Sequence, residues 1–107
     1  MKILILDKRV NRAKYYKKKL LNYDNDLTVI AVESISKFEF ENNGFDIVIV
    51  HKGNSEFEDI DEEVWDFNGK RFYFSGSWSA YYEREDGVVL SPAEEIISYV
   101  KKWINKK

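Results

Sequence analysis

Four polar residues stand where predicted strands end, and their side chains are of the kinds that bind ligands or take part in catalysis. They are Asp7, His51, Ser75 and Ser91. In an open α/β sheet the carboxyl ends of the parallel strands meet at one edge, and ligands bind beyond that edge. The sequence therefore predicts a ligand-binding site that brings these four residues together.

His51 is the only histidine, and an imidazole has the chemistry of a general base, a metal ligand or a phosphoacceptor. A simpler interpretation is a polar residue at a strand end that hydrogen-bonds to a neighbour such as Asp7. A Ser–His–Asp set made of Ser75, His51 and Asp7 is conceivable, but the chain lacks the G-x-S-x-G sequence of a nucleophile elbow. We therefore predict no catalytic residues and no enzymatic activity.

Phosphate, calcium and thiolate sites find little support in the sequence. Residues 75–77 (Ser-Gly-Ser) would present backbone amides to an anion only if a helix followed directly, and they match neither G-x-G-x-x-G nor the P-loop. Residues 56–66 lack the spacing and central glycine of an EF-hand. Without cysteine there are no disulfides or thiolate ligands. No metal and no cofactor is predicted. A protein that binds a small ligand or nucleotide at the four polar residues, with or without enzymatic activity, stays open as an alternative function.

The length and hydropathy of the chain favour one domain, residues 1–107, in an aqueous compartment. The apolar run 3–6 is too short for a signal peptide and is followed at once by charged residues. No stretch approaches the roughly 18 apolar residues of a membrane span. We expect a cytoplasmic location and no contact with membranes.

Charge is unevenly distributed along a chain whose formal net charge is only −2. Residues 1–26 hold eight Lys or Arg against three Asp, whereas residues 56–66 hold seven acids and no base. Both segments are compatible with solvated helix faces or with contact surfaces. The basic helix 8–19 has the charge to neutralise phosphates, although no recognised nucleic-acid-binding motif is present. Nucleic-acid binding is therefore a further alternative.

Apolar runs alternate with segments of helical periodicity along the whole chain. Strands are predicted at 3–6, 27–32, 45–50, 71–75 and 87–90, and helices at 9–22, at 37–42, within the acidic segment, and after residue 91. Residues 77–85 are ambiguous between a loop and a short helix. This alternation predicts an α/β three-layer sandwich with a five-stranded parallel sheet, in the flavodoxin-like order 2-1-3-4-5.

Capping residues predict where two of the helices begin. Ser34 is a candidate N-cap for the helix at 37–42. Ser91, Pro92 and Glu94 form a capping box with proline at the first helical position, so the last helix is expected to begin there. An ordinary trans Ser91–Pro92 bond is the simpler expectation.

Four segments of the chain resemble the receiver domain of response regulators. Residues 1–7 (MKILILD) resemble its first strand, and residues 45–50 (FDIVIV) resemble the third strand, which leads to the phosphoacceptor aspartate. Residues 72–75 (FYFS) resemble the fourth strand, and residues 87–92 (GVVLSP) resemble the stretch that carries the family's Lys-Pro pair. The resemblance spans nearly the whole chain and implies a signalling domain.

The chain departs from the receiver pattern at the residues that carry its chemistry. His51 stands at the expected phosphoacceptor, Lys8 at the second acid and Ser91 at the lysine, so that only Asp7 and Ser75 match. A single carboxylate is a poor magnesium site, because hard cations need several oxygen ligands. The resemblance therefore implies a degenerate pseudo-receiver that acts by binding, independently of aspartyl phosphorylation.

Aromatic residues are concentrated between positions 65 and 82. By resemblance, Trp78, Tyr81 and Tyr82 would lie on the surface formed by the fourth strand, fourth helix and fifth strand, through which receivers contact partners. Exposed Trp and Tyr anchor many protein interfaces. We expect these three residues to bind a protein partner or a second copy of the chain; the alternative is that they pack as core.

Overall fold

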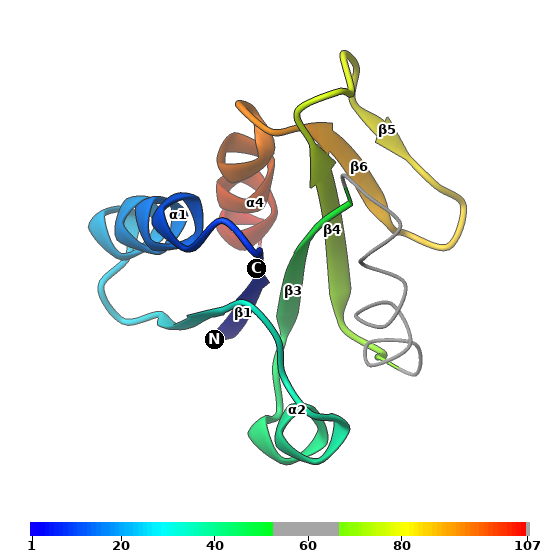
Figure 1. Cartoon of the computed structure of the whole chain (residues 1–107). Helices are drawn as coiled ribbons and strands as arrows, with labels where there is room; N and C mark the ends of the chain where they lie inside the picture. Colours follow the sequence, from blue (N-terminus) through cyan, green and yellow to red (C-terminus); the bar gives the residue numbers. More distant parts are fainter. Residues whose placement is uncertain (53–66, 107) are drawn as a thin grey trace.

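The computed structural model describes residues 1–52 and 67–106, which form a mostly parallel sheet with helices on both faces (Figure 1). The strands follow the order β2-β1-β3-β4-β6-β5, and only β5 is antiparallel to its neighbour. Their bounds are β1 Lys2–Leu6, β2 Thr28–Val32, β3 Ile47–His51, β4 Lys70–Ser75, β5 Tyr82–Glu83 and β6 Val89–Pro92.

The predicted α/β class is confirmed, but the predicted sheet of five strands, all parallel, is wrong in strand count and order. The additional strand is β5, which lies in the ambiguous segment 77–85 and pairs with β6 as a hairpin. The hairpin turns at Gly87, whose φ of 88° favours glycine, and the amide of Arg84 donates to the carbonyl of Val88. A strand of two residues has too little periodicity to be recognised from sequence.

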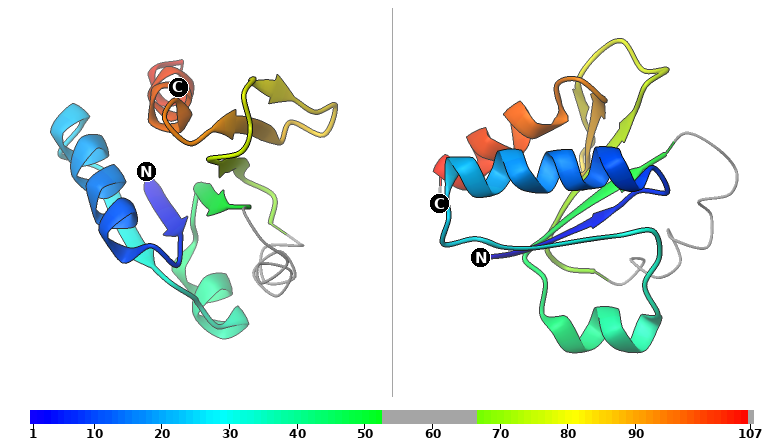
Figure 2. Two further views of the ribbon diagram at one scale, coloured as in Figure 1. Left: turned by 45° about the horizontal axis from the view of Figure 1, so that its top comes forward. Right: turned by 60° about the vertical axis from the view of Figure 1, so that its left-hand side comes forward.

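Of the described helices, two cover one face of the sheet and the third covers the other (Figure 2). Helices α1 (Val10–Tyr23) and α4 (Ile96–Asn105) pack side by side on the first face, and α2 (Lys37–Asn43) lies on the second. None of the described helices is long and apolar enough to cross a membrane. The helix predicted in the acidic segment lies outside the described residues.

The five parallel strands, β1 to β4 and β6, send alternate side chains into two hydrophobic clusters, as the pleat of a strand requires. In β1, Ile3 and Ile5 face α1 and α4, whereas Leu4 and Leu6 face α2, and all four are fully buried. A strand buried on both faces has no polar side to alternate with its apolar side. This is why the central strands are continuous apolar runs.

The predicted start of α2 at Lys37 is confirmed, but the predicted N-caps of both helices and the start of the last helix were wrong. Helix α2 begins after Ser36 rather than Ser34: the Ser36 hydroxyl accepts from the amide of Glu39, since Ile35 is still buried in the core beneath α2. The last helix begins only at Ile96. Ser91 and Pro92 instead extend β6, whose pairing with β4 continues to Ser75 opposite Pro92. The peptide bond between them is trans, as expected.

Candidate functional site

Three of the four predicted ligand-binding residues lie on the same face of the sheet at its carboxyl edge. Asp7 follows β1, His51 ends β3, and Ser91 lies in β6 two positions after Val89, which packs against the α1–α4 side. Ser75 lies two residues after Tyr73 in β4, so its side chain points to the same face of the sheet as Tyr73, which packs toward α2. The structure therefore does not bring all four together as predicted, and a Ser–His–Asp set cannot form from these residues.

Asp7 is fully buried, and its carboxylate is bound by the first turn of α1. Arg12 donates to it with two nitrogens, Nε to Oδ2 at 2.6 Å and Nη2 to Oδ1 at 2.8 Å. The backbone amide of Arg9 also donates to Oδ1, at 2.9 Å. The side-chain hydrogen bond to Asp7 is the main cause that raises the pKa of Arg12 above its ordinary value, and burial of the guanidinium opposes it. Asp7 thus has its charge balanced within the chain.

The Arg12 guanidinium also lies over the ring of Phe74, with its central carbon 5.2 Å from the ring centroid. Phe74 is fully buried and stands opposite both His51 of β3 and Ser91 of β6 in the strand registers. Tyr16 meets the same ring edge-on, and its hydroxyl donates to the carbonyl of Ala93 at 2.7 Å. An arginine and an aromatic core residue therefore occupy the middle of the candidate site.

His51 is half-buried, and its ring centroid lies 5.3 Å from that of Phe74. Burial lowers the pKa of His51 below its ordinary value of 6.5, the nearby charges of Arg12 and Arg9 lower it further, and Asp7 opposes them. The neutral imidazole is therefore the dominant form at neutral pH. A neutral ring cannot act as a general acid, and its packing on Phe74 is typical of a structural side chain.

The two serines use their hydroxyls within the chain. Ser91 is buried and donates to the carbonyl of Pro92 at 2.9 Å. Ser75 accepts from the amide of Ser77, and the two hydroxyl oxygens are 2.9 Å apart. No helix follows this turn, so the segment 75–77 lacks the geometry of a phosphate loop, as its sequence indicated.

Metal binding has no built site among the described residues. No group of three or more His, Asp or Glu side chains gathers there in a way that could hold an ion. A pocket of about 320 Å³ does lie beside Asp7, between α1 and the end of β2. Its walls are Val10, Ala13, Ala31, Val32, Glu33 and Ser34. The Asp7 oxygens at this pocket are the ones already bound by Arg12 and Arg9.

The aromatic residues predicted to bind a partner divide between the two faces of the sheet. Trp78 is half-buried and packs against the cluster beneath α2. Tyr82 is 60% exposed and stands opposite Leu90, which belongs to that same side. Tyr81 is 41% exposed and stacks on Tyr99 of α4 at 4.3 Å between ring centroids. Exposed aromatic surface is therefore present, but it is not one continuous patch.

A groove that the sequence did not reveal lies between β5 and α4, with a volume of about 350 Å³. It is lined by Lys70, Phe72, Tyr81, Glu83, Val89, Tyr99, Lys102, Trp103 and Lys106. Lys70 closes one side, because its ammonium donates to Glu83 at 2.9 Å and to the carbonyl of Gly87 at 2.7 Å. The Lys70 contact is the main reason that the pKa of Glu83 is lowered.

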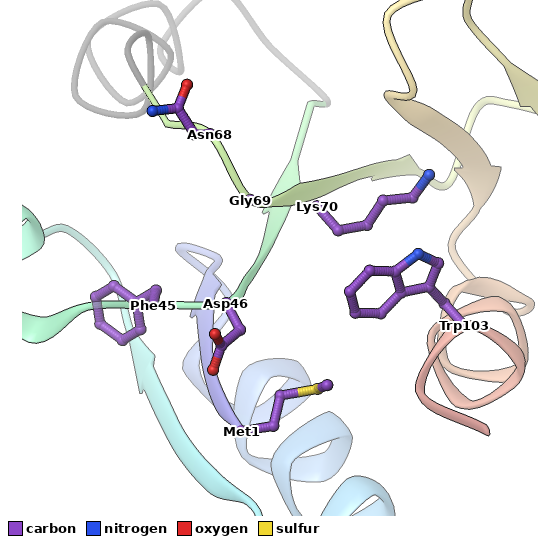
Figure 3. Close-up of a pocket in the computed structure, with 7 residues that line it drawn as sticks. All are labelled: Met1, Phe45, Asp46, Asn68, Gly69, Lys70 and Trp103. Carbon is purple, nitrogen blue, oxygen red and sulfur yellow. The ribbon is translucent and has the colours of Figure 1, made fainter. Parts of the chain in front are cut away.

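A larger pocket, of about 510 Å³, lies at the edge of the sheet where the strands begin, opposite the carboxyl edge that holds Asp7 and His51 (Figure 3). Trp103 and Lys70 form one side of it, and Met1, Asp46 and Phe45 lie across from them. One oxygen of Asp46 accepts from the backbone amide of Lys2 at 2.8 Å. The residues come from four separate segments, so sequence spacing gave no signal for this pocket.

Comparison with known proteins gives no relative: no family model, no curated protein and no solved structure matches the chain.

The Asp7–Arg12 pair makes a prediction about stability. In Arg12→Gln the buried carboxylate loses its charge partner, which should lower the free energy of unfolding by about 3 kcal/mol. Arg84→Gln removes an arginine from an exposed pair with Asp86 and should cost less than about 1 kcal/mol. Urea unfolding followed by circular dichroism measures both. Equal, small losses would contradict the structural role of Arg12.

The environment of His51 predicts a pH dependence of stability. Because the folded pKa is lowered, the unfolded chain binds the proton first as pH falls, so the free energy of unfolding should decrease as pH falls below about 6.5. His51→Gln should remove this contribution. NMR titration of the single imidazole gives the folded pKa directly; a value at or above 6.5 would refute the prediction.

Proposed function

We propose that the chain is a non-catalytic, receiver-like interaction module that contacts a protein partner or a second copy of itself and does not use aspartyl phosphate. The observation that carries the proposal is the state of the carboxyl edge: Arg12 binds both oxygens of Asp7, and His51 stands where a receiver has its phosphoacceptor. A carboxylate held in this way has little capacity left to bind magnesium.

The interaction surface we propose is the edge formed by β5, β6 and α4. Support comes from the exposure of Tyr81 and Tyr82 at the end of the sheet and from the adjoining groove, whose floor is Phe72 and Val89. Tyrosine buries a large area on binding at a small cost in side-chain entropy, so exposed tyrosines beside an apolar groove favour protein contact. Trp78 is half-buried on the α2 side of the sheet, the side that Tyr82 also faces, so it would add to the surface there and not at the groove.

The phosphorylation-independent part of the proposal is tested with acetyl phosphate and magnesium. Because no aspartate follows β3 and Asp7 is engaged by Arg12, intact-mass spectrometry should detect no phosphoryl adduct at any time of incubation. Asp7→Asn should behave identically. A single acid-stable or acid-labile phosphoryl group that disappears in Asp7→Asn would contradict the proposal.

The interaction surface is tested by photo-cross-linking in the cells that produce the protein. A benzophenone amino acid replaces Tyr82 or, as control, Phe38, which is 76% exposed on α2. The probe at position 82 should give a discrete protein adduct, either with a second copy or with a partner, and Tyr81→Ala should weaken it because Tyr81 forms part of the same edge. The same adducts from both positions, or none from position 82, would refute this surface.

A further inference from the structure

Helices α1 and α4 carry seven basic residues and no acidic residue within their bounds. In α1 these are Arg12, Lys14, Lys17, Lys18 and Lys19, and in α4 they are Lys101 and Lys102, followed by Lys106. Among the described residues, Arg12 is the only one of these basic residues that forms an ion pair. Besides Lys70, Lys106 lies close enough to Glu83 to lower the pKa of that carboxyl, whereas the lysines of α1 form no ion pair among the described residues.

The two helices form one continuous surface. They run in the same direction on the same face of the sheet, since Tyr16 reaches Ala93 just before α4 and Tyr23, the last residue of α1, meets Lys101 of α4 (Figure 2). Ala13, Tyr16 and Leu20 are buried on the side of α1 that faces the sheet, whereas Lys14, Lys18 and Lys19 are exposed. The basic helix foreseen from sequence is thus one half of a basic face whose other half is α4.

Exposed tyrosines lie among these lysines. Tyr15 is 55% exposed with the ammonium of Lys19 5.1 Å from its ring centroid, and Tyr23 is 43% exposed with the ammonium of Lys101 at 5.4 Å. Each pair presents an aromatic ring and a positive charge side by side. Such pairing is what a nucleotide requires, because its base stacks on aromatic rings and its phosphate binds an ammonium.

Carboxylates are present only at the ends of the two helices. Asp24 and Asp26 follow α1, and Asp24 accepts from the amide of Asp26. Glu94 and Glu95 precede α4, and Glu95 accepts from the hydroxyl of Tyr99 at 3.1 Å. The chain is acidic overall because seven of its 19 acids fall in residues 56–66, so its net charge conceals the positive face.

We propose that the α1–α4 face binds single-stranded nucleic acid without sequence preference. Lys14, Lys18 and Lys19 would contact phosphates along α1, Lys101 would do so on α4 beside α1, and bases would stack on Tyr15 and Tyr23. Stacking on flat rings needs unpaired bases, which favours single strands over duplex. This activity is separate from the protein contact proposed at Tyr81 and Tyr82.

Fluorescence anisotropy with labelled oligothymidylate and oligouridylate of about twenty nucleotides tests the proposal. We expect binding at low salt that weakens steeply as salt rises, with each phosphate contact adding about 0.7 to the slope of log affinity against log salt. The Lys14→Glu/Lys18→Glu variant should lose about tenfold or more in affinity and reduce this slope by about 1.4, the share of two contacts. Circular dichroism verifies that each variant is folded.

A charge-matched control separates the face from net charge. Lys37→Glu/Arg84→Glu makes the same change in net charge at α2 and at the β5 hairpin, and it should alter affinity by less than about twofold. Equal losses in the two double variants, or no binding of either oligonucleotide at low salt, would overturn the proposal. Tyr82→Ala should leave oligonucleotide binding unchanged, whether or not it abolishes the protein contact proposed at Tyr82.

The tyrosines distinguish single strands from other polyanions. Tyr15→Ala should weaken binding about five- to tenfold by removing a stacking partner, whereas Phe38→Ala, at an exposed aromatic on α2, should have no effect. Duplex DNA should bind more weakly than oligothymidylate. Equal binding of duplex with no effect of Tyr15→Ala, or displacement by polyglutamate at equal charge concentration, would overturn the assignment to single-stranded nucleic acid.

Discussion

The buried ion pair of Asp7 and Arg12 organises the carboxyl edge of this protein. A carboxylate with no solvent exposure must have its charge compensated and its oxygens hydrogen-bonded, or the fold would lose several kcal/mol. Arg12 meets both needs and in doing so fixes the start of α1 to the end of β1. The same guanidinium covers the Phe74 ring, so helix, first strand and fourth strand are joined at one side chain.

That arrangement bears directly on what the edge can do. The site that an open α/β sheet offers to ligands is occupied here by an arginine, an aromatic ring and a histidine with a lowered pKa. The features available for recognition lie elsewhere: tyrosines and a groove at the β5 side, and lysines with tyrosines on the α1–α4 face. For this reason both proposals concern binding surfaces.

Sequence reasoning succeeded where one physical signal dominates and failed where tertiary contacts decide. The apolar runs of β1 and β3 identified buried parallel strands, because only such strands are apolar on both faces. The capping pattern at Ser91 was overridden by pairing of β6 with β4, and β5 was too short to recognise. The Asp7–Arg12 contact spans a strand end and a helix start, a spacing that no helical or strand periodicity marks.

The brevity of β5 has a consequence for how molecules of this protein meet. Strand edges with many free amides and carbonyls invite other chains to extend the sheet, and short strands limit that risk. At this border β6 is already covered, and β5 offers only two residues, Tyr82 and Glu83, for further pairing. Glu83 adds a carboxylate that Lys70 holds in place. Few backbone groups at this border are therefore left to pair with another chain, so the shape of the exposed side chains determines what docks there.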